Sequence, residues 1–323
     1  MIVNERNTNT WSKIGSRATF GLELAEQAKS VDTLMVLTAD TSTSAGLDRF
    51  KKAFPERFID VGISEQNMMG IAAGLASEGF NVVTATFAPF QTLRCAEQIR
   101  VNLGYMRHKV TFAGLASGVV LGTLGYTHCC IEDLAVMRAI PGLVVLSPAD
   151  GAGVVKAVNA ALADPRPVYI RLTGGKDNPA VYTSDFDFHI GKAITLTEGD
   201  DVALIATGTM VHKALSAAEL LADQGIKAAV IDMHTIKPLD GEKISQLAKS
   251  TKLLVSIEEH SIIGGLGSAV AEILAGLDQA PPLLTLGLPD AYEKTGEYAD
   301  ILAYYGLTAE AIRTKVAHRL DQR

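Results

Sequence analysis

The sequence is poor in cysteine and in long uncharged hydrophobic runs, and each shortage excludes a class of protein. Its three cysteines, Cys95, Cys129 and Cys130, are an odd number without C-x-x-C spacing, so neither a disulfide framework nor a zinc site is indicated. The adjacent pair could react, although buried small hydrophobic residues are the more common interpretation. No segment offers about 20 uncharged apolar residues, so we expect no membrane-spanning helix.

Excess charge of one sign is also missing. The 29 Lys and Arg residues face 36 Asp and Glu, a net charge of −7 without any block of like charge, so nucleic acid is not an expected partner. The first residues, MIVNERNTNTWSKIGSR, lack a signal pattern, and we expect a soluble cytoplasmic protein. Hydrophobic residues (48%) and 29 glycines are abundant, and 323 residues fit two globular domains.

Short β-branched runs alternate with longer amphipathic segments, which predicts two doubly wound α/β domains. In the first half, strands are expected at residues 33–40, 57–62, 81–87, 109–116, 143–148 and 167–172. Residues 174–192 are rich in turn formers and predict a linker. In the second half, strands are expected at residues 201–207, 228–233, 253–259 and 283–288. We therefore assign residues 1–185 to the first domain and residues 186–323 to the second.

The most informative stretch is RFIDVGISEQNMMGIAAGLASEGFNVV, residues 57–83. A predicted strand leads to Gly62, which permits a sharp turn, and Ser64 is placed to cap the helix that follows. Glu65 falls in the first turn of this helix, where the helix dipole stabilises a carboxylate. On spacing alone, a stabilising surface acid and a functional carboxylate are equally good interpretations of Glu65.

Two further segments carry candidate functional side chains. In TFAPFQTLRCAEQIR, residues 86–100, Phe87 and Phe90 are three positions apart near a predicted helix start, where a plain core role is the more common interpretation. In GYTHCCIEDLAVMRAIPGLVVLSPAD, residues 125–150, His128 follows the glycine-rich run LASGVVLGTLGYT. That run predicts a loop at the edge of the sheet, which separates His128 from the other histidines of the chain.

These segments together resemble the transketolase family. D-V-G-I-S-E-Q followed by G-I-A-A-G-L-A is similar to the pyrimidine-binding domain of transketolase and deoxyxylulose-phosphate synthase, and T-F-x-x-F and T-H-x-x-x-E match later transketolase motifs. VIDMHTIKPLD and SIEEHSIIGGLGSAV resemble the carboxyl-terminal domain of that family. The resemblance implies a thiamine-diphosphate-dependent enzyme that transfers a two-carbon ketol fragment from a ketose donor to an aldehyde acceptor.

The resemblance also implies roles for the matched residues. Glu65 would hydrogen-bond the aminopyrimidine ring of thiamine diphosphate and promote the imino tautomer of that ring. Phe90, with Phe87 behind it, would pack against the ring, and such stacking contributes about 0.5–1.5 kcal/mol beyond burial. His128 would border both cofactor and substrate and serve as a proton shuttle.

Weaker matches come from the first strand and helix and from the turn before Glu65. Asp40 aligns with an acid near the cofactor, and Ile63 is a further candidate for cofactor contact. Arg17 and Ser44 fall where transketolases hold the substrate phosphate. Arg17 fits a solvated helix residue equally well.

The diphosphate half of the implied cofactor site has no match in the sequence. The family holds Mg²⁺ and the diphosphate with a G-D-G motif and a downstream Asn, whereas here Gly199 and Asp200 are followed by Asp201. We therefore expect no metal site in this chain. The resemblance predicts a split transketolase, with an amino-terminal partner chain that supplies Mg²⁺ and diphosphate binding in an α2β2 assembly.

Three positions depart from the family in its substrate site. Where ordinary transketolases have a histidine, an aspartate and an arginine that contact sugar hydroxyls and phosphate, this chain has Ala116, Leu124 and Gly174. Each lost hydrogen-bond partner costs about 1–3 kcal/mol, so we expect poor discrimination for an ordinary sugar phosphate.

Two other functions stay open at this point. One is a decarboxylating relative, similar to deoxyxylulose-phosphate synthase or to the beta subunit of a 2-oxoacid dehydrogenase. The other is a non-catalytic regulatory subunit, against which the presence of both Glu65 and His128 argues.

Overall fold

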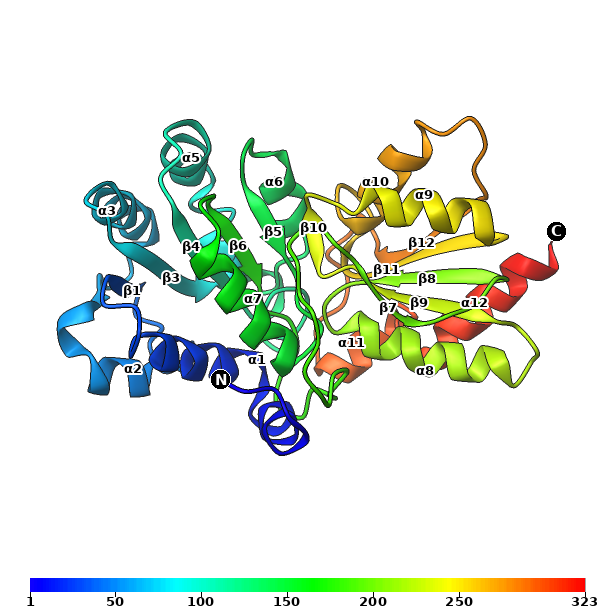
Figure 1. The fold of residues 1–323 in the computed structure, drawn as a ribbon. Helices are drawn as coiled ribbons and strands as arrows, with labels where there is room; N and C mark the ends of the chain where they lie inside the picture. Colours follow the sequence, from blue (N-terminus) through cyan, green and yellow to red (C-terminus); the bar gives the residue numbers. More distant parts are fainter. Residues whose placement is uncertain (323) are drawn as a thin grey trace.

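Two sheets, each covered by helices on both faces, lie side by side in a computed structural model that describes residues 1–322 (Figure 1). The first sheet has the strand order β10-β5-β6-β4-β3-β1-β2, and the second has the order β12-β11-β8-β9-β7. Neighbouring strands are parallel except where β10 pairs with β5 and β7 pairs with β9. The predicted pair of α/β units is therefore confirmed.

All six strands predicted in the first half are present, with ends trimmed by one to three residues. They are β1 (Leu34–Thr38), β2 (Phe58–Asp60), β3 (Asn81–Phe87), β4 (Val110–Leu115), β5 (Val144–Leu146) and β6 (Val168–Arg171). Sequence analysis missed the seventh strand, β10 (Thr235–Lys237), because it is only three residues long and Pro238 follows it directly. Since β10 comes from the second half of the chain, the two halves share the first sheet.

The second sheet holds the four strands predicted there and one that was missed. The missed strand, β7 (Ile194–Thr197), is a half-buried antiparallel edge strand that directly follows the linker. The predicted strands are β8 (Val202–Ala206), β9 (Ala228–Asp232), β11 (Leu253–Ser261) and β12 (Leu283–Leu288).

Helices cover both faces of each sheet, as expected for strands whose residues are buried throughout (Figure 1). One face of the first sheet carries α1 (Glu5–Gln27), α2 (Asp48–Ala53) and α7 (Gly151–Ala163); the other carries α3 (Glu65–Ser77), α5 (Ala96–Gln98), η2 (Ile99–Tyr105) and α6 (Asp133–Ala139). The second sheet lies between α8 (Met210–Ala222), α11 (Tyr298–Tyr304) and α12 (Ala309–Asp321) on one face and α9 (Gly241–Ser250) and α10 (Leu266–Leu274) on the other. Single turns form η1 (Pro55–Arg57), α4 (Ala88–Gln91) and η3 (Gly125–Thr127).

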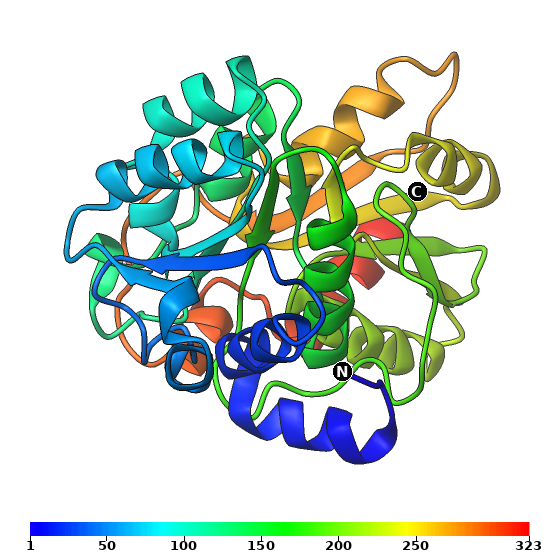
Figure 2. The same cartoon turned by 60° about the vertical axis from the view of Figure 1, so that its left-hand side comes forward.

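The predicted linker is irregular and packs against both halves. Figure 2 shows it passing beside the first turns of α1 on its way to the second sheet. The Ser12 hydroxyl donates to the Asn178 carbonyl at 2.6 Å, and the Asn178 N–H donates back to the Ser12 carbonyl at 3.1 Å. One apolar cluster contains Trp11 and Ile131 from the first half together with Leu204 and Val255 from the second. The two halves therefore form one packed body.

The parallel strands of the first sheet all end at the same edge. Turns and loops follow there after β1, β2, β3, β4 and β6, and they carry most of the predicted site residues. Ligands of open α/β sheets bind outside the carboxyl ends of the strands, so this edge is where a functional site is expected.

Candidate active site

Glu65 is the first residue of α3 and is almost completely buried, with 4% of its surface exposed. The turn before it uses Gly62 at φ +71°, a left-handed conformation that favours glycine. Ser64 occupies the position before the helix, but its hydroxyl donates to the Val61 carbonyl at 2.9 Å and makes no capping bond. The prediction that the Ser64 side chain caps the helix is therefore wrong, because the hydroxyl closes the preceding turn instead.

Arg94 connects Glu65 to the aromatic residues. Its Nη1 donates to Glu65 Oε1 at 2.8 Å, and its guanidinium carbon lies 4.1 Å from the centroid of the Phe90 ring. The Arg94 side chain is 43% exposed, so it covers the Glu65 carboxylate from the solvent side. Sequence analysis missed this residue. The available signal was its position four residues after Phe90, the spacing at which side chains share one face of a helical segment.

Phe87, Phe90 and His128 form an aromatic cluster next to this ion pair. The ring centroids are 6.4 Å apart for Phe87–Phe90, 6.0 Å for Phe87–His128 and 5.4 Å for Phe90–His128. The rings meet edge to face, the geometry that aromatic quadrupoles favour. His128 Nδ1 lies 3.0 Å from the Thr127 hydroxyl, which restricts the orientation of the imidazole. Three segments that are far apart in the sequence thus meet at one place.

The chemistry of these groups suits a planar nitrogen heterocycle. Among residues 1–322, the Glu65 side chain has no hydrogen-bond partner other than Arg94, so its second oxygen is available to a ligand. Partly exposed phenylalanine rings offer an apolar surface beside that carboxylate, and the His128 imidazole adds a group that can donate or accept a proton. The donor set fits the aminopyrimidine half of the cofactor implied by the sequence.

Asp40 and Ile63 lie after the neighbouring strands β1 and β2. Asp40 is exposed and has φ +55°, and its backbone N–H donates to Asp60 Oδ1 at 2.9 Å. The Gly62 N–H donates to the same oxygen at 3.1 Å. Asp60, which sequence analysis did not single out, therefore ties both turns together. Ile63 is 78% exposed beside this arrangement, which leaves its side chain open to a ligand or partner.

Arg17 and Ser44 come together through their backbones. Arg17 lies in α1, and Ser44 belongs to the turn before α2. A Cβ atom at Gly46 would lie 2.9 Å from the Arg17 carbonyl oxygen, which shows how closely the turn approaches the helix. Burial lowers the pKa of Arg17. Neither the Arg17 nor the Ser44 side chain makes a hydrogen bond or ion pair within residues 1–322, so both are available to an anion.

The three positions that depart from the family pattern have different environments. Ala116 is fully buried at φ +51°, directly after β4. Gly174 has φ +76°, and a Cβ atom there would lie 2.8 Å from Thr209 Cγ2, so the backbone leaves no room for a side chain. Leu124 is 55% exposed in the loop that leads to His128.

The Gly199–Asp201 segment forms a tight turn and not a ligand loop. A Cβ atom at Gly199 would lie 2.5 Å from the Ala228 carbonyl carbon. Asp201 accepts the Lys227 N–H at 2.9 Å and an ion pair from Lys252 at 2.7 Å. These contacts fix the entry to β8, so the segment has a structural role.

Two searches of the described part of the chain give negative results. Residues 1–322 contain no group of three or more His, Cys, Asp or Glu side chains arranged to hold a metal ion. None of the helices in the same range combines the length and the apolar character needed to cross a membrane.

The sequence matches two family descriptions. Residues 12–176 match the transketolase pyrimidine-binding domain, and residues 191–312 match the transketolase C-terminal domain. These two ranges fall on either side of the linker.

Curated relatives match nearly the whole chain. One of the two apulose-4-phosphate transketolase chains of Phocaeicola vulgatus is 39% identical over 300 residues, which cover 93% of this chain and 95% of that protein. A 6-deoxy-6-sulfo-D-fructose transketolase subunit from a Clostridium species is 40% identical over 302 residues, covering 93% of this chain and 92% of that protein. Among solved structures, a split-gene transketolase described as an inactive β4 tetramer superposes with a TM-score of 0.85 at 40% identity, covering 95% of this chain and 98% of that one.

Proposed function

Because this chain belongs to the transketolase family, we propose that it is the carboxyl-terminal subunit of a split, thiamine-diphosphate-dependent transketolase. The proposed reaction moves a two-carbon ketol fragment from a ketose donor to an aldehyde acceptor. The solved relative that carries the words inactive β4 tetramer in its description supports the view that such a subunit needs a second, different chain.

The observation that carries this proposal is the meeting of Glu65 with the aromatic cluster of Phe87, Phe90 and His128. A buried carboxylate, an apolar ring surface and an imidazole occur side by side at the carboxyl ends of parallel strands. When bound, thiamine diphosphate supplies the electron sink for carbon–carbon bond cleavage. The residues of this chain supply the groups that hold and polarise its pyrimidine ring.

Each residue then has a definite task. The free oxygen of Glu65 hydrogen-bonds the pyrimidine ring nitrogen, and Phe90, supported by Phe87, packs against the ring. His128 faces the reacting end of the site and moves a proton to or from the substrate hydroxyl. We place Asp40 and Ile63 near the cofactor, and we place Arg17 and Ser44 near an anionic part of the substrate.

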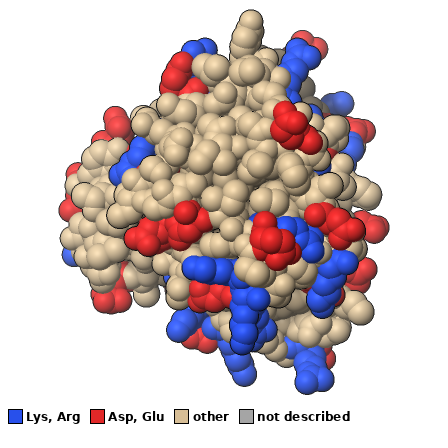
Figure 3. All heavy atoms as spheres, turned by 90° about the vertical axis from the view of Figure 1, so that its left-hand side faces the viewer, with Lys and Arg blue, Asp and Glu red and all other residues tan. Residues whose placement is uncertain are grey.

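The surface around α3 supports a partner on this side of the molecule. The residues of α3 that face solvent are Gln66, Asn67, Gly70, Gly74 and Ser77, which are small or uncharged. Figure 3 shows a broad surface without Lys, Arg, Asp or Glu across the upper part of this side, where Figure 1 shows α3, while Lys and Arg gather lower down. Charge depletion is typical of the core of a protein interface.

We propose that an amino-terminal subunit covers this surface and holds Mg²⁺ and the diphosphate. An α2β2 assembly in the cytoplasm is the simplest form of the enzyme. The absence of a G-D-G motif from the sequence supports this division of labour between the chains.

Reconstitution tests the proposal. The purified chain should be folded and inactive, and mixing it with its diphosphate-binding subunit, Mg²⁺ and thiamine diphosphate should restore transketolase activity. In the reconstituted enzyme, Glu65→Gln should lower the rate of hydrogen–deuterium exchange at C2 of the cofactor by about 10²-fold or more, the low end expected for loss of general acid–base catalysis. Asp48→Asn, in the charged surface of α2, is the matched control and should leave that rate unchanged.

Two results would contradict the proposal. Thiamine-dependent turnover by the rigorously purified single chain would show that no partner is needed. Release of carbon dioxide from pyruvate by the reconstituted enzyme would assign it to the decarboxylating relatives.

We also propose that the donor differs from an ordinary ketose phosphate. Ala116, Leu124 and Gly174 offer no side-chain hydrogen bond, and the two relatives above carry the names of two different sugars. A site that binds a hydroxyl can reject its deoxy analogue by about 10⁴-fold, and a site without those groups loses that power. Comparing kcat/KM for xylulose 5-phosphate with deoxy, branched and unphosphorylated ketoses decides this, and ordinary efficiency with xylulose 5-phosphate would refute it.

A further inference from the structure

The loop that carries His128 is a closed unit. Residues 117–130 leave β4 and return to the edge of the sheet, where Gly118 and Cys130 pair through their backbones. The Gly118 N–H donates to the Cys130 carbonyl at 2.7 Å, and the Cys130 N–H donates to the Gly118 carbonyl at 2.9 Å. His128 stands two residues before this closure, so its position depends on how the two ends of the loop are held.

A buried carboxylate from the second half of the chain holds the entry to this loop. Glu259 lies in β11, is 1% exposed, and accepts the Val119 N–H at 2.8 Å through Oε1. Its other oxygen accepts hydroxyl hydrogens from Thr209 at 2.8 Å and Tyr298 at 2.6 Å. A Cβ atom at Gly118 would collide with Glu259 Oε1, so the loop backbone rests directly on the carboxylate.

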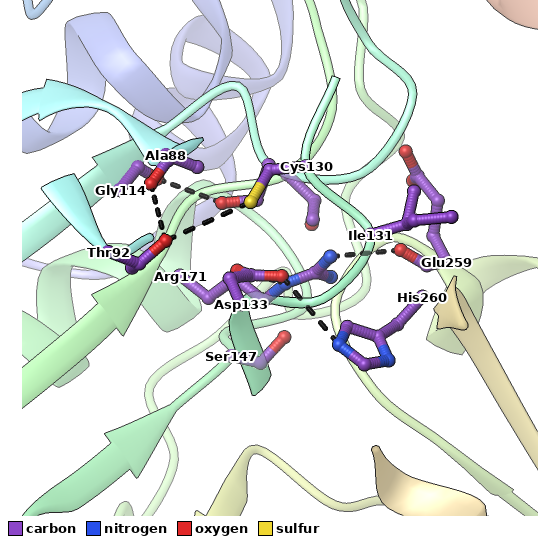
Figure 4. Close-up of polar contacts among 12 residues, drawn as sticks. Ala88, Thr92, Gly114, Cys130, Ile131, Asp133, Ser147, Arg171, Glu259 and His260 are labelled. Carbon is purple, nitrogen blue, oxygen red and sulfur yellow. Dashed lines mark hydrogen bonds and ion pairs between the residues drawn. The ribbon is translucent and has the colours of Figure 1, made fainter. Parts of the chain in front are cut away.

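The exit of the loop is held by the same strand. The Ser261 N–H at the end of β11 donates to the Ile131 carbonyl at 2.9 Å. Asp133 accepts Arg171 Nε at 2.8 Å, and Arg171 Nη2 donates to the Glu259 backbone carbonyl at 2.9 Å. Figure 4 shows Arg171 reaching between Asp133 and Glu259, with His260 on the opposite side of Asp133.

Keeping a carboxylate here has a cost that plain packing between two halves would avoid. Burial raises the pKa of Glu259, and the Tyr298 hydroxyl and the Arg171 charge act in the opposite direction. A hydrogen bond to a charged acceptor is shorter and about twice as strong as a neutral one, so the carboxylate fixes the Val119 amide more firmly than an uncharged group would.

We propose that Glu259 is a positioning residue that sets the place of His128 by clamping the loop at Val119. The inference rests on the proposed function for its consequence in catalysis, although the clamp itself does not. The second half of the chain then acts on the active site directly, in addition to packing against the first. Displacement of a reacting group by about 1 Å can cost about 10²-fold in rate, so loosening this clamp should be visible in kinetics.

Amide hydrogen exchange of the full chain tests the clamp without any need for activity. In Glu259→Ala, exchange at residues 117–130 should become about 10- to 100-fold faster, the factor expected for the loss of one hydrogen bond to a charged group. Exchange in β8 and β9 should stay at the wild-type rate. Glu259→Gln keeps an oxygen for Val119 and should restore most of the protection.

Glu258 offers a matched control on the same strand. It is equally buried, but its carboxylate accepts the N–H groups of Leu266 and Gly267 at the start of α10, at 2.7 and 2.8 Å. Glu258→Ala should therefore increase exchange at the start of α10 and leave residues 117–130 unchanged.

Kinetics of the reconstituted enzyme provide the second measurement. Glu259→Ala should lower kcat/KM by about 10- to 100-fold with the dissociation constant of thiamine diphosphate unchanged within about twofold, since Glu65 and Phe90 do not contact the clamp. Glu259→Gln should recover most of this loss.

Two outcomes would overturn the inference: wild-type exchange of residues 117–130 in folded Glu259→Ala, or a loosened loop with wild-type kcat/KM. If Glu259→Ala does not fold, Gly118→Ala attacks the same contact from the loop side, and unchanged loop exchange in that variant would refute the clamp. An inactive wild-type complex whose loop loosens in Glu259→Ala would refute the proposed function and support the clamp.

Discussion

Two ion pairs of equal length lie on opposite sides of the loop that carries His128. Arg94 approaches Glu65 at 2.8 Å, and Arg171 approaches Asp133 at 2.8 Å. The Arg94 side chain is 43% exposed, whereas Arg171 and Asp133 are 1% and 0% exposed. The pairs therefore share a geometry and differ in access to water.

The difference separates a site from its framework. Arg171 and Asp133 have further partners, since the Tyr169 hydroxyl donates to Asp133 and the Glu259 carbonyl accepts from Arg171. Arg94 can swing into water at small cost and leave Glu65 to a ligand. Opening the buried pair would strand a charge in the interior. The exposed pair keeps binding capacity in reserve, and the buried pair uses all of its capacity on the fold.

Breaking the buried pair should have the largest effect on stability. Asp133→Ala leaves the Arg171 guanidinium buried without its counter-charge, and we expect the free energy of unfolding to fall by about 3–5 kcal/mol. Denaturant unfolding followed by circular dichroism measures this loss. The double variant Asp133→Leu/Arg171→Met removes both charges and should recover most of the stability. A loss below about 1 kcal/mol in Asp133→Ala would place this pair with the exposed ones.

The buried cluster should also respond to pH. Burial raises the pKa of Glu258 to about 7 from a usual value of 4.5, and the N–H groups of Gly267 and Leu266 offset part of that rise. Because the folded state favours the protonated carboxyl, the stabilisation is complete below pH 4.5 and is lost as pH rises through about 7. Relative to Glu258→Gln, the wild-type free energy of unfolding should fall by up to about 3 kcal/mol across that window. Parallel stability curves for the two proteins would contradict this.

The exposed half of the comparison was largely predictable from the sequence. Glu65, Phe90 and His128 lie in segments whose turn residues and helix starts are local signals, and these segments carry the resemblance to a known family. Arg94 was missed although its spacing from Phe90 was visible, because an arginine in a helical segment is usually a solvated residue.

The buried half was not predictable. Glu258 and Glu259 sit in a strand whose run of S-I-E-E-H shows no apolar alternation, yet every residue of β11 is buried. Two partners of Glu259, Val119 and Arg171, are 140 and 88 residues away in the sequence, and their contacts depend on how the two sheets meet. Strand β10 was missed for a related reason, since its pairing with β5 exists only once the two halves have packed.

Breaking the exposed pair should have the smallest effect. Arg94→Met removes the charge near Glu65 but keeps an apolar stem over the Phe90 ring, so it tests the ion pair separately from the packing. We expect the free energy of unfolding to fall by only about 0.2–1 kcal/mol, because exposed pairs gain little over their hydrated charges. That loss should shrink further in 1 M salt, where the screening length is about 3 Å, while the loss in Asp133→Ala should persist. The same denaturant titrations at low and high salt measure both variants. A salt-independent loss of about 3 kcal/mol in Arg94→Met would show that the Arg94–Glu65 pair belongs to the framework, and the distinction between the two pairs would fail.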